Sequence, residues 1–308
     1  VPGEEAETNQ TWGGLALKLG ETSSCGLGQF HTEKAGNRFP GVPPEQEVFK
    51  GSNPVCWGRG ALGELGLGSN QIDDDIEAPD KRVAIGNDGP FFGRVIGVKQ
   101  LQCAWENGGP IQTRIFCWGR DPNGVMKNWG EDVPIEDRGW FKPEEVAGSK
   151  DIPGIIEGQF AMQDMGIGIA HACAVRFKST GTSLACWGHN DRGQLGSPDS
   201  PRVAFKNQVI LDIVKDPVHV AVGHNHTCAS TSNNEIYCWG DNRFGQSGAV
   251  DTLVGVQTNS HSVTEPNRVF DGGSAEVVGL FAGANNSCAL LKPPGAGGIT
   301  TIHCWGEN

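Results

Sequence analysis

The tripeptide Cys-Trp-Gly occurs five times along the chain, and this repeat constrains the fold more than any other feature. The copies begin at Cys56, Cys117, Cys186, Cys238 and Cys304. A string with two rare residues does not recur five times by chance in 308 residues that contain ten Cys and nine Trp. The tripeptide therefore marks a structural unit that is repeated along the whole chain.

Three further blocks surround each copy of the tripeptide. A Gly-x4-Cys block, one residue longer in the second repeat, precedes it and ends at Cys25, Cys103, Cys173, Cys228 and Cys288. A short apolar stretch lies before that block, at 15–19, 95–98, 160–165, 218–222 and 277–281. A glycine-rich turn follows the tripeptide, and a Pro-x-x-Val-like segment comes next, at 79–83, 143–146, 201–203 and 266–269. Each repeat therefore predicts four short strands separated by Gly, Pro, Asn and Asp.

Four strands in about 60 residues are typical of one blade of a β-propeller. A single blade cannot bury both faces of its sheet, so blades must pack side by side. We expect one all-β domain over residues 1–308, a β-propeller of about five four-stranded blades or part of a larger, seven-bladed one. The repeats fall at about 15–83, 95–146, 160–205, 218–270 and 277–308. The competing fold is a solenoid of stacked sheets, whose repeats are usually shorter, about 20 to 30 residues.

The ten cysteines predict one disulfide in each repeat. The midpoints between consecutive cysteines consist of turn-forming residues, at 39–41, 108–110, 179–181, 232–234 and 295–297. Two consecutive cysteines then lie opposite each other on a hairpin, at a separation that suits a disulfide. The predicted pairs are Cys25–Cys56, Cys103–Cys117, Cys173–Cys186, Cys228–Cys238 and Cys288–Cys304. The alternative is five buried pairs of free thiols in a cytosolic protein, whereas regular pairing favours an oxidising, extracellular or cell-surface setting.

Residues 186–196, Cys-Trp-Gly-His-Asn-Asp-Arg-Gly-Gln-Leu-Gly, resemble the repeat of the regulator-of-chromosome-condensation family. His171-Ala172-Cys173 and His226-Thr227-Cys228 resemble the strand that precedes it in that family. The resemblance extends from about residue 15 to 308 and implies a propeller. The founding member, a nuclear exchange factor for a small GTPase, has seven blades and lacks these cysteines. The paired cysteines resemble those of secreted members, such as crinkly-type receptor ectodomains and bacterial surface proteins.

This sequence departs from the family in two respects. Five repeats are visible where seven are usual, and the last repeat has no glycine turn or Pro-x-x-Val segment after Trp305. The chain also begins at Val1 without a leader, so we expect any secretory signal to have been removed.

The charge and the length of the apolar runs argue against nucleic acid and membrane as partners. The net charge is −12, and Lys and Arg form no cluster of the kind that binds phosphates. No apolar run approaches the about 20 residues that span a bilayer. We therefore expect neither nucleic-acid binding nor membrane insertion.

Catalytic and metal-binding motifs are absent from the sequence, so we expect no catalytic residue and no bound cofactor. His171 and His226 share one repeat position, which indicates a packing or hydrogen-bonding role within each blade. Asp73, Asp74 and Asp75 form an acidic run for which a solvated loop is one interpretation and calcium binding another.

Three Asn-x-Ser/Thr sequons predict glycosylation at Asn9, Asn225 and Asn285 in a eukaryotic source. The last two occupy the equivalent turn of the fourth and fifth repeats.

The long connections, residues 26–55 and 120–160, are where we expect partner binding, because loops on a rigid scaffold commonly carry it. The second connection contains Trp129, Trp140 and Phe141, and exposed tryptophan is a frequent hot-spot residue. The alternative is that both tryptophans are buried under the rim of the propeller.

These features favour an extracellular, non-enzymatic protein-binding or assembly module. A first alternative is a propeller that inhibits or regulates a partner enzyme or GTPase. A second is an enzyme with its active site in the funnel of the propeller.

Overall fold

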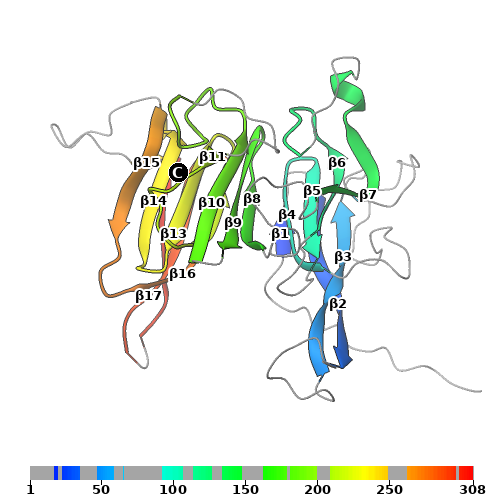
Figure 1. Cartoon of the computed structure of the whole chain (residues 1–308), viewed down its shortest axis with the longest axis horizontal. Helices are drawn as coiled ribbons and strands as arrows, with labels where there is room; N and C mark the ends of the chain where they lie inside the picture. Colours follow the sequence, from blue (N-terminus) through cyan, green and yellow to red (C-terminus); the bar gives the residue numbers. More distant parts are fainter. Residues whose placement is uncertain are drawn as a thin grey trace, which may run out of the picture. The chain divides into compact units, whose positions relative to one another are not determined.

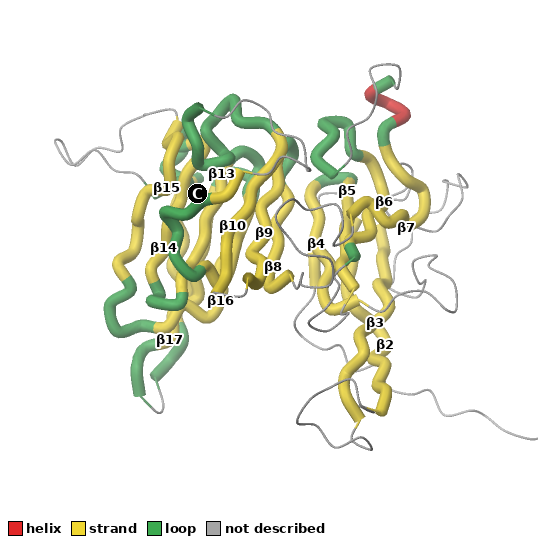
Figure 2. The backbone as a smooth tube through the Cα atoms, in the orientation of Figure 1, coloured by secondary structure: helices red, strands yellow, loops and turns green. Residues whose placement is uncertain are grey.

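The computed structural model describes the strands and turns of all five repeats. The described residues are 17–19, 23–34, 47–58, 65, 92–106, 114–126, 134–147, 162–178, 181–199, 209–248, 262–295 and 298–307. They form eighteen β-strands and one short 3-10 helix, η1 (Ile135–Asp137), as Figures 1 and 2 show. The predicted all-β fold is confirmed.

Each repeat forms an antiparallel sheet, which we call blades 1 to 5 in chain order. Blade 1 contains β1 (Leu17–Leu19), β2 (Ser23–Lys34) and β3 (Glu47–Gly58), and blade 2 contains β4 (Phe92–Val98), β5 (Leu101–Glu106), β6 (Ile115–Arg120) and β7 (Gly139–Ala147). Blade 3 contains β8 (Met162–Ile167), β9 (His171–Lys178), β10 (Gly181–Gly188) and β11 (Val209–Ile210). Blade 4 contains β12 (Pro217–Val222), β13 (His226–Thr231), β14 (Glu235–Asp241) and β15 (Ser262–Asp271). Blade 5 contains β16 (Glu276–Ala282), β17 (Asn286–Lys292) and β18 (Thr301–Gly306).

The chain divides into two compact units. The first consists of residues 1–108, 115–120 and 140–145, and the second of residues 109–114, 121–139 and 146–308. In the first unit, blades 1 and 2 are joined into one seven-stranded sheet by a single pair, Ser52 opposite Phe92. In the second unit, blades 3, 4 and 5 form separate sheets of four, four and three strands.

The described strands lie where the repeat predicts them. Segments 143–146 and 266–269 lie in β7 and β15, the fourth strands of blades 2 and 4. In blade 3, β11 pairs with β10 through Ala185 and Cys186. Segments 79–83 and 201–203 lie outside the described residues.

One disulfide joins the second and third strands of every blade, as the hairpin midpoints predict. The bridges are Cys25–Cys56, Cys103–Cys117, Cys173–Cys186, Cys228–Cys238 and Cys288–Cys304. In each case the two cysteines are directly opposed in the register of the pair. No cysteine is free.

The glycine of Cys-Trp-Gly ends the third strand for a steric reason. Gly188 and Gly240 have φ values of 109° and 99°, a region that L side chains rarely adopt. A Cβ on Gly188 would also collide with the carbonyl oxygen of Ala170. The glycine therefore lets the chain leave the strand against the turn that precedes β9.

The core of the second unit lies between successive blades. We call the face by which blades 4 and 5 pack on the preceding blade the near face, and the opposite face of a blade its far face. Between blades 3 and 4, Val175 and Leu184 meet Val220, Ala229 and Trp239. The cluster between blades 4 and 5 repeats this arrangement one blade later, with Ala221, Cys228, Ile236 and Cys238 against Val277, Leu280, Ala289 and Leu291.

Candidate functional site

The loop after β10 is held rigid by its own buried polar side chains. Asn190 accepts a hydrogen bond from the Leu195 N–H through Oδ1, at 2.9 Å, and donates through Nδ2 to the Ser197 carbonyl, at 2.7 Å. Gln194, fully buried, accepts the N–H of Arg192 at 2.7 Å. The side chains of the loop tip therefore project from a fixed backbone.

The loop after β14 repeats this scheme one blade later. Asn242 accepts the Ser247 N–H at 3.0 Å, and Gln246 accepts the Phe244 N–H at 2.8 Å. Ser247 Oγ donates to the carbonyl of Asp241 at 2.9 Å. Asn and Gln at these positions are therefore anchors, and the residues between them are free to differ from blade to blade.

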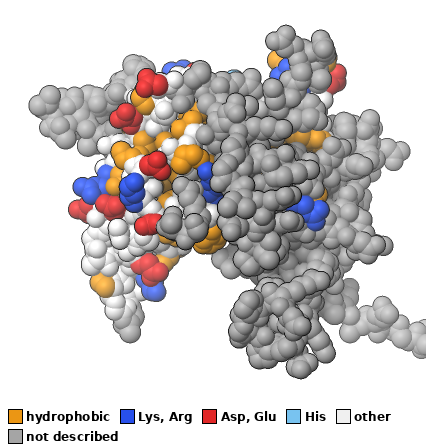
Figure 3. Space-filling view, in the orientation of Figure 1, with side chains coloured by type: hydrophobic (Ala, Val, Ile, Leu, Met, Phe, Trp, Pro, Cys, Tyr) orange, Lys and Arg blue, Asp and Glu red, His pale blue; other side chains and the backbone are white. Residues whose placement is uncertain are grey.

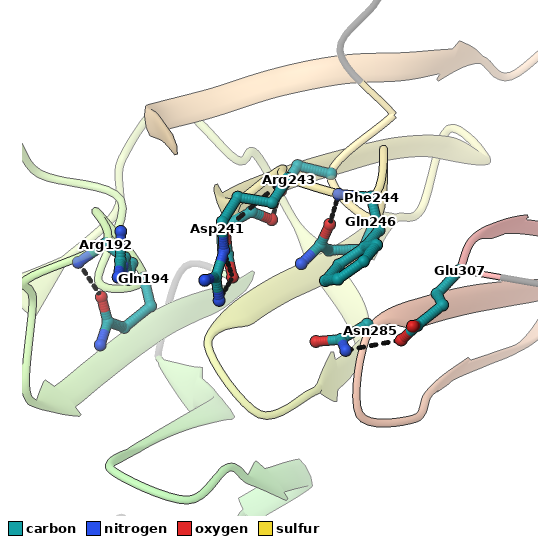
Figure 4. A network of polar contacts seen from close by, with 9 residues as sticks. Arg192, Gln194, Asp241, Arg243, Phe244, Gln246, Asn285 and Glu307 are labelled. Carbon is teal, nitrogen blue, oxygen red and sulfur yellow. Dashed lines mark hydrogen bonds and ion pairs between the residues drawn. The ribbon is translucent and has the colours of Figure 1, made fainter. Parts of the chain in front are cut away.

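The tips of these loops and the end of β18 carry charged and aromatic side chains. We define the loop rim as Asp191, Arg192, Arg243, Phe244, Asn285 and Glu307. The equivalent tip positions hold Asp191 and Arg192 in blade 3 but Arg243 and Phe244 in blade 4. Figure 4 shows five of these six residues, all except Asp191, in one view, at the same end of the three sheets.

Two polar pairs fix side chains on the loop rim. Arg243 donates to both carboxylate oxygens of the buried Asp241, with the shortest contact at 2.7 Å from Nη2. The hydrogen bonds and charge of Asp241 raise the pKa of Arg243. Asn285 Nδ2 donates to Glu307 Oε2 at 2.7 Å. Phe244 beside them is 39% exposed, so the rim offers an aromatic ring among oriented charges.

A buried polar network joins blade 3 to blade 4. His171 Nε2 lies 2.9 Å from Thr227 Oγ1, and the Thr227 hydroxyl donates to the Gln194 carbonyl at 3.1 Å. Because that hydroxyl proton is used, His171 donates through Nε2–H. Trp239 Nε1 donates to the same Gln194 carbonyl at 2.9 Å. One carbonyl at the foot of the rigid loop thus accepts two hydrogen bonds from the next blade.

The same network joins blade 4 to blade 5. His226 Nε2 lies 2.9 Å from Ser287 Oγ, and Ser287 and Trp305 both donate to the Gln246 carbonyl, at 3.1 and 2.9 Å. The hydrogen-bonding role predicted for the shared repeat position of His171 and His226 is therefore present, but the bond runs to the next blade and not within one blade.

Both histidines are neutral in the folded protein. Burial lowers the pKa of His171 to about 3, and the charge of His226 adds to the lowering. Burial lowers the pKa of His226 to about 4, although the backbone of Asn286 and the charge of Asp241 oppose it. A histidine with so low a pKa stays unprotonated near neutral pH. These pKa values follow from the packing of the blades.

Neither metal binding nor membrane crossing has support in the described part of the chain. No group of three His, Cys, Asp or Glu side chains there is arranged to hold a metal ion. Asp73, Asp74 and Asp75, the predicted calcium candidates, lie outside the described residues. No helix within the described ranges is long and apolar enough to cross a membrane.

The sequons of blades 4 and 5 occupy equivalent turns. The backbone carbonyl of Asn225 accepts the Asp241 N–H, and that of Asn285 accepts the Glu307 N–H, at 2.8 and 2.9 Å. Glycosylation at both sites stays a prediction, and Asn9 lies outside the described residues.

The structure corrects the predicted binding role of Trp140. This side chain is only 6% exposed, in β7, so it belongs to the core and is not available as an exposed hot spot. Trp129 and the side chain of Phe141 lie outside the described residues, and their role stays a prediction. The sequence analysis also missed the loop rim, although the two tip positions between the Asn and Gln anchors already differ between repeats three and four.

The fold and this network define a class: an all-β repeat protein whose blades are linked by a His–hydroxyl–carbonyl chain. Comparison with known proteins identifies the repeat. Residues 184–230 and 217–246 match two family models, each described as a regulator of chromosome condensation (RCC1) repeat. Residues 184–246 therefore carry RCC1 repeats, and the predicted resemblance is confirmed.

The chain is also similar to parts of curated relatives and to solved structures. The X-linked retinitis pigmentosa GTPase regulator homolog of Caenorhabditis elegans is 29% identical over 68% of this chain, but the match covers 16% of that protein. Yeast RCC1 (Prp20), solved bound to Kap60, superposes on 89% of this chain and 53% of its own, with a TM-score of 0.58 and 18% identity, which shows the fold alone. The crinkly ectodomain of the Arabidopsis thaliana receptor kinase ACR4 is 16% identical over 97% of this chain and 69% of its own, with a TM-score of 0.44. The chain spans about a sixth of the curated relatives it matches.

Proposed function

We propose that this protein is a non-enzymatic module that binds a protein partner through the loop rim. The observation that carries this proposal is the loop rim itself, where rigid, internally anchored loops present exposed charged and aromatic tips that differ between blades. Loops of this kind on a rigid scaffold are a common basis of protein recognition. An aromatic ring and arginines are also the side chains most often found at interface hot spots.

Relatives with the same repeat support a protein partner. Yeast RCC1 was solved bound to Kap60, and its binding to Gsp1p and histones has been described. The nematode relative is named as a GTPase regulator homolog. Regulation of a partner, including a GTPase, is therefore the second candidate function, and the loop rim is the surface that would contact it. The five disulfides support an extracellular setting for this chain, because such bridges persist in oxidising compartments.

The test is a partner-binding assay with variants of the loop rim. Phe244→Ala removes an exposed side chain and Arg192→Ala a partly buried one, and both leave the Asn and Gln anchors of their loops in place. Matched controls are Phe177→Ala and Arg268→Ala, since these side chains are 46% and 54% exposed and lie on β9 and β15, outside the rim. Proteins cross-linked to the wild type in its native milieu are identified first, and their affinity is then measured for every variant.

We expect the rim variants to weaken binding by about 2 kcal/mol or more, which is about 30-fold in affinity, and the controls to bind as the wild type does. Equal affinity for all variants would place the partner elsewhere. The long connection that contains Trp129 and Phe141 is the second predicted contact and would be tested next.

A further inference from the structure

The side chains of the loop rim offer more unused hydrogen-bond donors than acceptors. Its two exposed carboxylates already lie beside polar groups: Glu307 Oε2 accepts from Asn285 at 2.7 Å, and Asp191 Oδ1 lies 3.7 Å from His189 Nδ1. The guanidinium of Arg192 makes no hydrogen bond or ion pair within the described part of the chain, although it carries five N–H donors. The rim therefore has unused donors, which favour a ligand that supplies acceptors.

Arg243 is held in place, but only part of its guanidinium is used. Nε and Nη2 donate to the two oxygens of the buried Asp241. Nη1 and the second hydrogen of Nη2 have no acceptor among the described residues, and the side chain is 42% exposed. Two N–H groups at that outer edge match the two oxygens of a carboxylate. Because Asp241 already orders the side chain, little conformational entropy is lost when the edge binds a ligand.

The charge of Asp241 also limits which anion suits this edge. Carboxylate and phosphate both accept hydrogen bonds from a guanidinium. Asp241 contacts Arg243 directly, at 2.7 Å, so it repels a phosphate with nearly two negative charges more strongly than a carboxylate with one. The outer edge of Arg243 therefore favours a carboxylate.

Phe244 adds an apolar contact next to this donor edge. It follows Arg243 in the chain and is 39% exposed, and its N–H is bound by Gln246, so its backbone is fixed. In the view of Figure 4 its ring lies between the Arg243–Asp241 pair and the pair of Asn285 with Glu307. A carboxylate bound to Arg243 thus brings the side chain next to it close to an aromatic ring.

We propose that the loop rim binds a segment of its protein partner in which Asp or Glu lies beside a large apolar residue. The carboxylate accepts from the outer edge of Arg243, and the apolar side chain packs on Phe244. Arg192, from the preceding blade, adds a second positive charge at the same end of the sheets, as Figure 4 shows. This inference rests on the proposed function, because it names the chemistry of the partner at the same surface.

The first test uses a phage library of random short peptides, selected on the full 308-residue chain and counter-selected on its Phe244→Ala variant. Counter-selection removes peptides that bind outside the loop rim. The enriched peptides should carry Asp or Glu next to a large apolar residue or one residue away from it. Enrichment of basic or uncharged peptides, or no enrichment over the counter-selected pool, overturns the proposal.

The affinity of one enriched peptide then measures the role of the arginines. Arg192→Gln and Arg243→Lys should each weaken binding about tenfold, because each removes charge-assisted hydrogen bonds to the carboxylate. Arg243→Lys keeps a cation that can pair with Asp241, so the fold is retained while the planar donor edge is lost. Arg268→Gln is the matched control, since it removes an exposed arginine on β15, outside the rim. Wild-type affinity in both rim variants overturns the proposal.

Changes in the peptide separate the two sources of negative charge. Replacing its acidic residue with the matching amide should weaken binding to the wild type and remove the difference between the wild type and Arg192→Gln. A phosphoserine at that position should bind more weakly than the acidic residue. A phosphopeptide that binds more tightly overturns the assignment of a carboxylate.

The partner found by cross-linking separates failure of this inference from failure of the proposed function. Its affinity should fall in Phe244→Ala, Arg192→Gln and Arg243→Lys alike. A loss with Phe244→Ala alone overturns this inference and leaves the proposed function standing. Wild-type affinity in all three variants overturns both, because the partner then does not contact the loop rim.

Discussion

Blades 4 and 5 are built from the same repeat, yet blade 4 is buried on both faces and blade 5 on one. Ile236 and Ile302 occupy the same position, two residues before the cysteine of the Cys-Trp-Gly strand, and they are 1% and 70% exposed. The repeat therefore specifies which positions are apolar, and the neighbouring blade decides whether they become core.

The difference in burial between blades 4 and 5 also shows which contacts stabilise the array of blades. Free energy in a repeat protein is approximately the sum of the blades and of the interfaces between neighbours. In the second unit those interfaces hold both the apolar clusters and the histidine links. A change in a face buried between two blades should therefore cost far more than the same change in the exposed far face of blade 5, which we call the open face (Phe281, Cys288, Leu290, Ile302 and Cys304).

The largest expected effect comes from a charge placed in each face. Ile236→Asp buries an unpaired carboxylate between blades 4 and 5 and should lower the free energy of unfolding by about 5 kcal/mol. Ile302→Asp should change it by less than about 0.5 kcal/mol, because the carboxylate stays in water. Urea unfolding of both variants measures the contrast. Similar losses would mean that the open face is part of a folded core.

The second-largest expected effect is a loss of stability in acid, caused by the two histidines buried between blades. The unfolded histidines bind protons below pH about 6.5, while His171 and His226 in the folded state bind them only near pH 3 and 4. Stability is therefore complete above pH 6.5 and falls as the pH drops toward these values, by about 2 kcal/mol for each histidine at pH 5. The titratable groups that act on His171 are His189 and His226. Those that act on His226 are His224 and Asp241.

Unfolding at pH 7 and pH 5 tests this dependence. Replacing both residues with Gln should flatten the profile. A double variant as acid-sensitive as the wild type would show that other groups carry the effect.

The sequence analysis succeeded where the repeat fixes geometry and was wrong or incomplete elsewhere. The five disulfides were predictable because each pair of cysteines flanks a turn-forming midpoint. A structural role for His171 and His226 was predictable because they share a repeat position, but the sequence did not show that their bonds run to the next blade. The burial of Trp140 was not predictable, because this residue lies in a fourth strand that varies between repeats and its environment depends on tertiary packing.

The loop rim illustrates a further limit. Its anchors, Asn242 and Gln246, are visible as repeat residues, but only the structure shows that their side chains bond the loop from inside and leave Phe244 exposed. A polar repeat residue can equally be solvated or structural, and sequence alone does not separate the two.

A smaller effect is expected from single links between blades. Thr227→Val removes the acceptor of His171 and leaves a buried N–H without a partner, which should cost about 1–3 kcal/mol. Asn286→Ala, at the equivalent of a histidine position but exposed, should cost less than about 0.5 kcal/mol. Thermal unfolding at pH 7 compares them. If both variants match the wild type, the links add nothing to stability.

The smallest expected effect is the energetic coupling between Thr227 and Trp239, which both donate to the Gln194 carbonyl. Trp239→Phe removes the indole N–H but leaves the Gln194 carbonyl with the Thr227 hydroxyl, so the hydrogen bond it loses should cost only about 1 kcal/mol. In the double variant with Thr227→Val the carbonyl has lost both of these donors. The combined loss should therefore exceed the sum of the single losses by about 1 kcal/mol. For Trp305 the same substitution should cost less, because this half-buried position admits water to the Gln246 carbonyl. Additive losses at blade 4 would contradict the shared-acceptor geometry.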